Sequence, residues 1–386
     1  MTVCDEEEGP AIWRGLASFC LGDGERPAED FYLLPLIEPT LAQGGFRLAG
    51  GWRRFRRVSL LKRRAGGAAG LDIPVAGFLR WLDQAPAALA ARLHRQFEAL
   101  TVPRAHWAGL SLDQPRIMGI VNVTPDSFSD GGRPGGAAGA IAHGEALAAA
   151  GADILDIGGE STRPGSIPVP VEEELRRVLE VVETLAHRGH RVSVDTRNPV
   201  VMTAVLKAGA GIINDVAGLT APGALDVAAR HNEGEAASVV LMHMQGDPQS
   251  MQTQPHYHAA ALDVFDYLEA RIAAAAAAGI PPEKVMVDPG IGFGKTLDHN
   301  LEILRHLALY HGTGCPILLG VSRKGFISKI AGQSDPRERL GGSLAAALAG
   351  FDGGVQVFRV HDVAETRQAL AVAQALTAFE QDRKNA

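Results

Sequence analysis

The sequence predicts a (β/α)8 barrel that follows a small α+β domain. From about Leu110 onward, short apolar runs rich in β-branched residues alternate with longer stretches rich in Ala, Leu and Glu. Eight such units fill about 270 residues, which suits a barrel in both number and length. A polar or otherwise special residue follows nearly every apolar run, as the converging loops at one end of a barrel would require.

Each apolar run is short enough to be a strand, and each Ala-rich stretch is long enough to be a helix. The predicted strands are Ile117–Val123, Ile154–Ile157, Val192–Val194, Gly211–Ile213, Ser238–Met242, Val285–Val287, Pro316–Leu319 and Val355–Phe358. The predicted helices include Gly139–Ala150, Glu172–Arg188, Pro199–Ala208, Ala259–Ala278 and Leu301–Leu309. An open, doubly wound sheet is the alternative, but its polar residues would gather near one topological switch point. The even distribution of polar residues favours the barrel.

The first part of the chain lacks this alternation. We assign residues 1–106 to an N-terminal extension of unknown function and residues 107–386 to the barrel, with a linker near Thr101–Ala108. The basic run at residues 52–64, "WRRFRRVSLLKRR", is interpreted as a solvated strand and turn; an RNA or membrane surface is the alternative. We expect a chain without residues 1–100 to retain the activity of the barrel.

Composition limits the class of protein. Of the 386 residues, 46% are hydrophobic, and the formal net charge is -7, which argues against a nucleic-acid-binding protein. The sequence contains no apolar run long enough to cross a membrane, and the acidic start "MTVCDEEEGP" is unlike a signal peptide. The three cysteines are few and widely spaced, which favours a reducing compartment. We therefore expect a cytoplasmic protein.

Two Gly-rich polar loops follow the first two predicted strands. Asn122 ends the first strand, where its amide oxygen could bind a hard cation, and "TPDSFSDGG" continues it as a mobile loop. After the second strand, "GGESTRPG" offers Thr162 and Arg163, a hydroxyl and a guanidinium suited to phosphate. Either loop alone could be a simple turn. The pair indicates an anionic substrate enclosed by flexible arms.

Carboxylate and amide groups end three further strands: Asp195, Asn214 and Asp288. Such groups are costly to bury unless a partner pairs with them. A flat heterocycle with several N–H donors and ring acceptors would be such a partner. The alternative for each residue is a helix cap; Asp195, for example, precedes a predicted helix and could be its N-cap.

The final loops carry most of the expected cations. The glycines of "GIGFGK" lack the spacing of a nucleotide motif and are predicted to shape a tight loop that presents Phe293. "GVSRKGFI" places Ser322, Arg323 and Lys324 after the seventh strand, and "FRVHDV" places Arg359 and His361 after the eighth. The last two strand loops of such barrels are common phosphate sites, so three cations and an imidazole are expected there.

Taken in order, "GIVNVTPDSFSDGG", "GGESTRPG", "SVDT", "INDV", "LMHMQG", "DPGIGFGK", "SRK" and "RVHD" closely resemble the motifs of the dihydropteroate synthase family. The resemblance covers the chain from about Trp107 to its end. It implies a (β/α)8 barrel that joins 6-hydroxymethyl-7,8-dihydropterin diphosphate to 4-aminobenzoate with Mg2+ and releases pyrophosphate. It also implies a homodimer with small-molecule substrates only.

The resemblance assigns a role to each matching residue. The implied pterin-binding residues are Asp195, Asn214, Met242, Asp288 and Lys324. The implied diphosphate-binding residues are Asn122, Thr162, Arg163, Arg359 and His361, and Asn122 would also bind Mg2+. The implied aminobenzoate-binding residues are Phe128, Thr162, Pro164, Phe293, Ser322 and Lys324. The residues expected to act in catalysis are Asp195, Lys324 and Asp130, the last by organising the closed loop.

Two alternatives remain open. A pterin-binding methyltransferase barrel would share the pterin-facing Asp and Asn residues but would have no use for the diphosphate loop or the cations. A catalytically silent paralogue that acts as an interaction protein would bind the pterin diphosphate without turnover.

Overall fold

Eight parallel strands form the centre of the computed structural model, which describes residues 15–20, 27–38, 44–104, 106–123, 135–161, 165–231 and 236–383. The strands are β7 (Arg116–Asn122), β8 (Ile154–Gly158), β9 (Val192–Asp195), β10 (Ile212–Asp215), β11 (Ser238–Met242), β12 (Val285–Asp288), β13 (Leu318–Leu319) and β14 (Val357–Val360). Their order in the sheet is β12-β11-β10-β9-β8-β7-β14-β13, and a parallel bridge between Val287 and Ile317 joins the two ends. This closure confirms the predicted barrel and excludes an open sheet.

The strands pack because their side chains alternate between the barrel interior and the surrounding helices. Met118, Ile154 and Val240 belong to a fully buried interior cluster, whereas Val121 and Ile157 belong to the larger core under the helices. Trp107 also belongs to the interior cluster, and its Nε1 donates to the Lys284 carbonyl at 3.0 Å. Trp107 lies on a hairpin of β5 (His106–Trp107) and β6 (Leu110–Ser111), which therefore closes the barrel at the amino ends of the strands.

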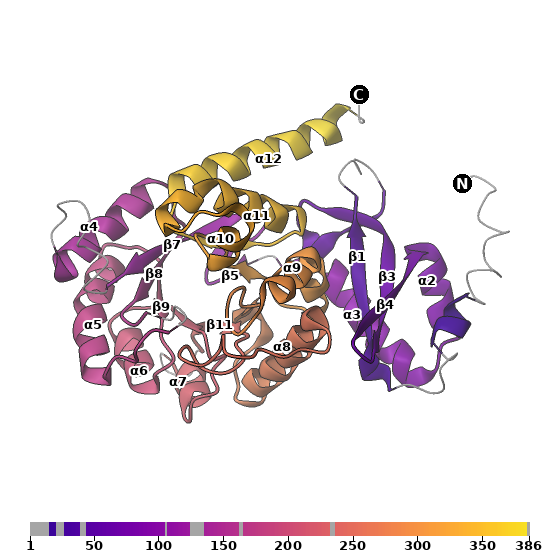
Figure 1. Cartoon of the computed structure of the whole chain (residues 1–386), viewed down its shortest axis with the longest axis horizontal. Helices are drawn as coiled ribbons and strands as arrows, with labels where there is room; N and C mark the ends of the chain where they lie inside the picture. Colours follow the sequence, from indigo (N-terminus) through magenta and orange to yellow (C-terminus); the bar gives the residue numbers. More distant parts are fainter. Residues whose placement is uncertain are drawn as a thin grey trace.

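The helices surround the barrel (Figure 1). They are α4 (Gly136–Ala149), α5 (Val171–His187), α6 (Pro199–Lys207), α7 (Ala224–Ala229), α8 (Ala260–Ala277), α9 (Leu297–Arg305), α10 (Gly325–Ala331), α11 (Leu340–Asp352) and α12 (Val363–Arg383), with 3-10 turns η5 (Pro282–Lys284), η6 (Leu307–Thr313) and η7 (Pro336–Arg339). The helix predicted at Leu301–Leu309 begins and ends earlier, because Thr296 and His299 form a capping box that starts α9, and η6 follows as a separate element.

The N-terminal domain is an antiparallel sheet with two main helices. Its strands are β1 (Phe31–Ile37), β2 (Phe46–Arg47), β3 (Arg54–Arg64) and β4 (Gly67–Pro74); its helices are α2 (Val75–Leu82) and α3 (Ala87–Thr101), with 3-10 turns η2 (Ala28–Asp30) and η3 (Leu48–Gly50). Figure 1 shows the domain beside the barrel, nearest α8 and α9. The cores of the two units are in contact, since Tyr32 and Leu61 pack into the barrel cluster and Ala308 of η6 packs into the domain cluster.

The predicted solvated strand at residues 52–64 is solvated only in part, because its two ends contact the barrel. The Trp52 ring stacks on Phe351 of α11, with centroids 5.2 Å apart, and its Nε1 donates to the Phe351 carbonyl at 3.0 Å. Arg53 forms an ion pair with Asp352, and Arg63 at the other end of β3 forms ion pairs on α8. Arg53 and Arg63 thus fasten the domain to two barrel helices, which the sequence pattern alone did not indicate. Arg56, Arg57 and Arg64 are exposed, as predicted.

Candidate active site

A buried ion-pair network lies at the carboxyl ends of β8, β9 and β14. Arg359 donates from Nε to Asp156 Oδ2 at 2.6 Å and from Nη2 to Asp195 Oδ2 at 2.8 Å. Asp156 is completely buried and also accepts from Ser193 Oγ at 2.6 Å and from Asn214 Nδ2 at 3.2 Å. Because the Asn214 amide nitrogen is turned toward Asp156, the Asn214 amide oxygen is available to accept a hydrogen bond from elsewhere.

Sequence reasoning missed Asp156. Its signal was present, since a charged residue in the middle of the apolar strand "ILDIG" needs a buried partner. The structure supplies that partner in Arg359, which the sequence had placed toward a diphosphate. Arg359 therefore serves as the counter-ion of two buried carboxylates, Asp156 and Asp195.

Asp195 has an unsatisfied oxygen. Its Oδ1 is buried and has no hydrogen-bond partner among the described residues. Burial raises the pKa of the Asp195 carboxyl, and the charge of Arg359 opposes that rise. The residue is not the N-cap of α6, because the Asn198 side chain fills that position by accepting from Val200 N at 3.1 Å. A ligand N–H directed at Oδ1 would satisfy this oxygen.

The opposite wall consists of Asp288, Gly320 and Lys324. A methyl group on Gly320 would lie 3.8 Å from Lys324 Nζ and 3.9 Å from Asp288 Oδ2, so the two charged groups converge over this glycine. Burial raises the pKa of the Asp288 carboxyl and lowers that of the Lys324 ammonium to about 8, in each case against the opposing effect of the other charge. Met242 pairs with Asp288 in the sheet and is 3% exposed.

The "GIGFGK" loop is held from inside by its own lysine. Lys295 is 1% exposed and donates from Nζ to the carbonyls of Gly290 at 2.8 Å and Phe293 at 3.0 Å, and it lies 2.8 Å from His243 Nδ1. Gly290 has a φ of 69°, and a methyl group there would lie 1.9 Å from the His243 carbonyl oxygen. This tight loop presents Phe293, whose ring centroid is 4.5 Å from Lys324 Nζ.

One of the three cations expected after β13 and β14 is bound elsewhere. Arg323 donates from Nε to Asp362 Oδ2 at 3.0 Å, which corrects its predicted place in a phosphate site. Ser322 and His361 do meet, with Ser322 Oγ 3.0 Å from His361 Nδ1 and accepting from the His361 backbone N–H at 3.2 Å. The expected cluster therefore reduces to Lys324 and Arg359 beside this pair.

Asn122 lies on the same rim. It pairs in register with Gly158, which pairs with Asp195. A methyl group on Gly158 would lie 3.9 Å from Asn122 Oδ1 and 3.8 Å from the Asp195 Cβ, so these two side chains flank that glycine. The predicted Phe128, Asp130, Thr162, Arg163 and Pro164 lie outside the described residues.

The family model of pterin binding enzymes matches residues 118–361, which include this whole site. The chain is 46% identical over 281 residues to a dihydropteroate synthase of Escherichia coli strain K12, covering 72% of this chain and 98% of that one. It is 50% identical over 272 residues to a dihydropteroate synthase of Neisseria meningitidis serogroup B, covering 69% and 94%.

The chain is also similar to solved structures of dihydropteroate synthases. The chain superposes on a Xanthomonas albilineans dihydropteroate synthase with 4-aminobenzoic acid at a TM-score of 0.65 and 50% identity, covering 70% of this chain and 95% of that one. A second structure from that organism, in complex with 7,8-dihydropteroate, gives a TM-score of 0.63 and 47% identity, covering 70% and 96%. A Yersinia pestis dihydropteroate synthase in a sulfonamide drug complex gives 0.66 and 44%, with the same coverage.

Proposed function

Because this chain belongs to the dihydropteroate synthase family, it joins (7,8-dihydropterin-6-yl)methyl diphosphate to 4-aminobenzoate and releases pyrophosphate, and we propose that the residues at its barrel mouth divide the work as follows. The carrying observation is the buried, unsatisfied Oδ1 of Asp195 within a network of fixed charges. A reduced pterin brings N–H donors that fit such an acceptor.

Asp195, Asn214 and Asp288 bind the pterin ring through their oxygens, and Met242 packs beside it. Asp156 and Arg359 keep Asn214 and Asp195 in the orientation that leaves their acceptors directed at the ring. Lys324 completes the pocket opposite Asp195. We propose that it lies between the pterin site and the aminobenzoate site, which its position beside Asp288 and near the Phe293 ring supports.

The diphosphate lies toward Asn122, Thr162, Arg163, Arg359 and His361. Arg359 uses Nε and Nη2 on the two aspartates, so Nη1 is the atom that is left to bind a phosphate oxygen. This arrangement lets one guanidinium hold the pterin pocket and the leaving group together.

The chain's own residues fit a magnesium ion that arrives with the diphosphate. The Asn122 side chain makes no hydrogen bond within the described part of the chain, so its amide oxygen is available as a ligand. The described residues contain no group of three His, Cys, Asp or Glu side chains that could hold a metal. Mg2+ commonly binds through one or two protein oxygens plus substrate phosphates, which matches this donor set. When bound, it neutralises charge on the diphosphate.

The reaction needs no covalent nucleophile. The C–O bond to the diphosphate breaks first, and the electron-rich pterin stabilises the methylene cation that results. The carboxylates of Asp195 and Asp288 favour that positive charge, while Arg359 and His361 stabilise the departing anion. The arylamine nitrogen then forms the C–N bond to this cation and releases one proton to solvent. It needs only correct placement, by Phe128, Thr162, Pro164, Phe293, Ser322 and Lys324, and Asp130 organises the closed loop.

The direct test is pyrophosphate release from the pterin diphosphate with 4-aminobenzoate. Methyl transfer from a methyl-folate in place of this reaction would revive the methyltransferase alternative. Binding of the pterin diphosphate without turnover would revive the silent paralogue. A sulfonamide should compete with 4-aminobenzoate and should leave binding of the pterin substrate intact.

Removal of Mg2+ by a chelator should abolish turnover, and Asn122→Ala should raise the Mg2+ concentration needed for half-maximal rate by about 10-fold or more. The measurement is pyrophosphate release against Mg2+ concentration. A matched control is Asn198→Ala, which removes an amide that caps α6 and should leave the Mg2+ requirement unchanged. Full turnover in the presence of the chelator would contradict the role of the metal.

The depressed pKa of Lys324 predicts an alkaline limit to activity. The ammonium loses its charge as the pH rises through about 8, so kcat/KM should fall above that pH as the cation beside Asp288 disappears. A Lys324→Arg variant stays charged at every accessible pH. Its activity, although lower, should show no decline near pH 8; an unchanged alkaline limb would assign the titration to another group.

The assembly is inferred from the resemblance, and the location from the acidic start of the sequence and its few, widely spaced cysteines. We propose a cytoplasmic homodimer that acts on small molecules and binds no nucleic acid. None of the helices in the described part of the chain has both the length and the apolar character needed to cross a bilayer.

A further inference from the structure

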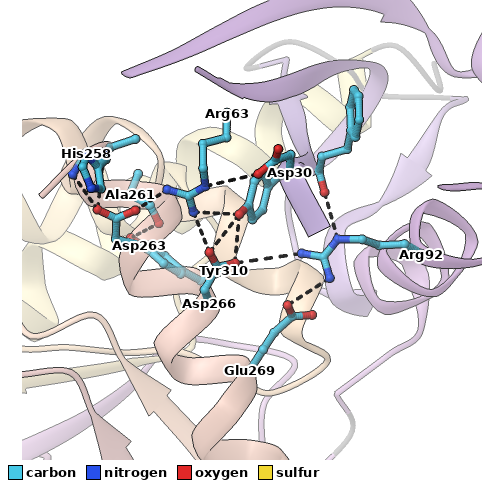
Figure 2. A network of polar contacts seen from close by, with 12 residues as sticks. Asp30, Arg63, Arg92, His258, Ala261, Asp263, Asp266, Glu269 and Tyr310 are labelled. Carbon is cyan, nitrogen blue, oxygen red and sulfur yellow. Dashed lines mark hydrogen bonds and ion pairs between the residues drawn. The ribbon is translucent and has the colours of Figure 1, made fainter. Parts of the chain in front are cut away.

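The N-terminal domain meets an acidic face of α8. Asp263, Asp266 and Glu269 are spaced three residues apart, so they lie along one side of the helix. Figure 2 shows Arg63 and Arg92 of the domain directed at this face. Arg92 donates from Nη1 to Glu269 at 3.1 Å and from Nε to the Phe31 carbonyl at 3.0 Å.

Arg63 binds nearer the start of the helix. Its Nη1 donates to Asp263 Oδ1, and its Nη2 lies 2.5 Å from Asp266 Oδ2 and 2.7 Å from the Tyr32 hydroxyl. The Tyr32 hydroxyl in turn donates to Asp266 at 2.9 Å. The side chain of Arg63 is 20% exposed and that of Asp263 is 23% exposed, so the pair is mostly shielded from solvent.

Asp263 also holds the segment that precedes α8. Its second oxygen, Oδ2, accepts from the backbone N–H groups of His258 at 2.8 Å and Ala259 at 3.3 Å. These N–H groups lie at the start of a helix, where donors lack partners within the helix, and no side chain of the N-cap residue binds them. Arg63 therefore holds the Asp263 carboxylate in the position from which it binds the turn at His258.

The same segment touches the loop that carries Phe293. The Tyr257 hydroxyl donates to the Gly294 carbonyl at 2.8 Å, and Gln252 Nε2 donates to the Gly292 carbonyl at 2.8 Å. A methyl group on Gly294 would lie 2.3 Å from the Gln245 carbonyl oxygen, so the two loops are in close contact. A chain of contacts therefore joins Arg63 to the "GIGFGK" loop. Arg63 binds Asp263, Asp263 binds the backbone N–H of His258, and the neighbouring Tyr257 binds the Gly294 carbonyl.

We propose that the N-terminal domain positions the active-site loops of the barrel, and that Arg63 is the positioning residue through which it does so. The proposal extends the proposed function, because it assumes that Phe293 shapes the aminobenzoate site. Arg63 touches no substrate. It holds the β11–α8 segment against the loop at residues 290–294, and so sets where Phe293 stands relative to Lys324.

The test compares Arg63→Met with Arg92→Met in the full-length chain. Both variants remove one cation from the same interface, but only Arg63 contacts Asp263. Arg63→Met should raise the KM for 4-aminobenzoate about 5-fold or more and leave kcat within about 2-fold. Hydrogen exchange of the backbone amides at residues 256–259 and 290–294 should become faster. Arg92→Met should change neither quantity, and Arg63→Lys should restore part of the effect on KM.

If Arg63→Met and Arg92→Met accelerated hydrogen exchange equally, the proposal would be overturned, because a general loosening of the interface would then explain the effect. An unchanged KM and unchanged exchange in Arg63→Met would overturn it as well. The exchange measurement does not depend on turnover. If the parent chain released no pyrophosphate, the proposed function would fail while exchange still decided whether Arg63 positions the loops.

Discussion

Replacing Asp195 with asparagine should lower kcat by about 100-fold or more while the protein keeps its fold. Removal of one preorganised group that stabilises transition-state charge typically costs about 100- to 1,000-fold in rate. The carboxylate has a buried oxygen without a partner among the described residues, and in the proposed site its charge would favour the methylene cation. Asparagine has nearly the same shape but no charge. The measurement is steady-state pyrophosphate release together with thermal melting.

The fold should tolerate this change because Arg359 retains its bond to Asp156 at 2.6 Å. The substitution also removes a negative charge whose burial is unfavourable, as the raised pKa of Asp195 indicates. The melting temperature should therefore stay the same or rise. Near-normal turnover in Asp195→Asn would remove the assignment of the pterin pocket.

Asp215→Asn provides a matched control. Asp215 is also a fully buried carboxylate at the end of a barrel strand, but its two oxygens accept from the N–H groups of Ala217 at 2.7 Å and Leu219 at 2.8 Å. Asparagine can accept only one of these bonds, so the control should cost about 1–3 kcal/mol of stability. Its kcat should change little. The two variants thus separate a binding role from a structural role.

Deletion of residues 1–104 should destabilise the barrel, whereas from the sequence alone we expect a chain without residues 1–100 to retain its activity. Tyr32 and Leu61 pack into the barrel core, and Trp52 covers Phe351. Removing a buried aromatic side chain costs about 3–5 kcal/mol, and each kcal/mol lowers the melting temperature of a barrel of this size by about 2–4 °C. We expect a melting temperature at least about 10 °C lower, or aggregation.

The deletion also leaves the acidic face of α8 without its arginines, so like charges at Asp263 and Asp266 repel across one turn. Co-expression of residues 1–104 as a separate chain is the control, because it restores every interface contact. A truncated barrel with unchanged melting temperature and activity would show that the domain is only an attachment. Rescue by the separate domain would show that it is integral.

The barrel could be predicted from sequence because each strand end carries its own polar signal in chain order. The walls of the pocket could be predicted for the same reason: Asp195, Asn214 and Asp288 each end a short apolar run. The role of Asp156 was harder to predict, because Asp156 lies two residues before the end of its strand and its partner Arg359 is 203 residues away. Spacing along the chain contains no information on such a pair.

The interface of the N-terminal domain could not be predicted, because cations that alternate with apolar residues look the same on a solvated strand and on a strand docked against acids. What distinguishes the two is the acidic face of α8, about 200 residues later in the chain. The prediction for Arg323 was wrong for a different reason. The sequence placed it beside Lys324, but a left-handed backbone (φ 59°) accompanies its pairing with Asp362.

The hairpin that carries Trp107 has a consequence for how such a chain can be assembled. The N-terminal domain joins the barrel through this hairpin, at the amino ends of the strands, whereas the proposed substrate site lies at the carboxyl ends. A gene fusion at this point lengthens no catalytic loop. The chain can therefore enter the barrel at its closed end, with the N-terminal domain packed against α8 and α11, while the route to the proposed substrate site stays open.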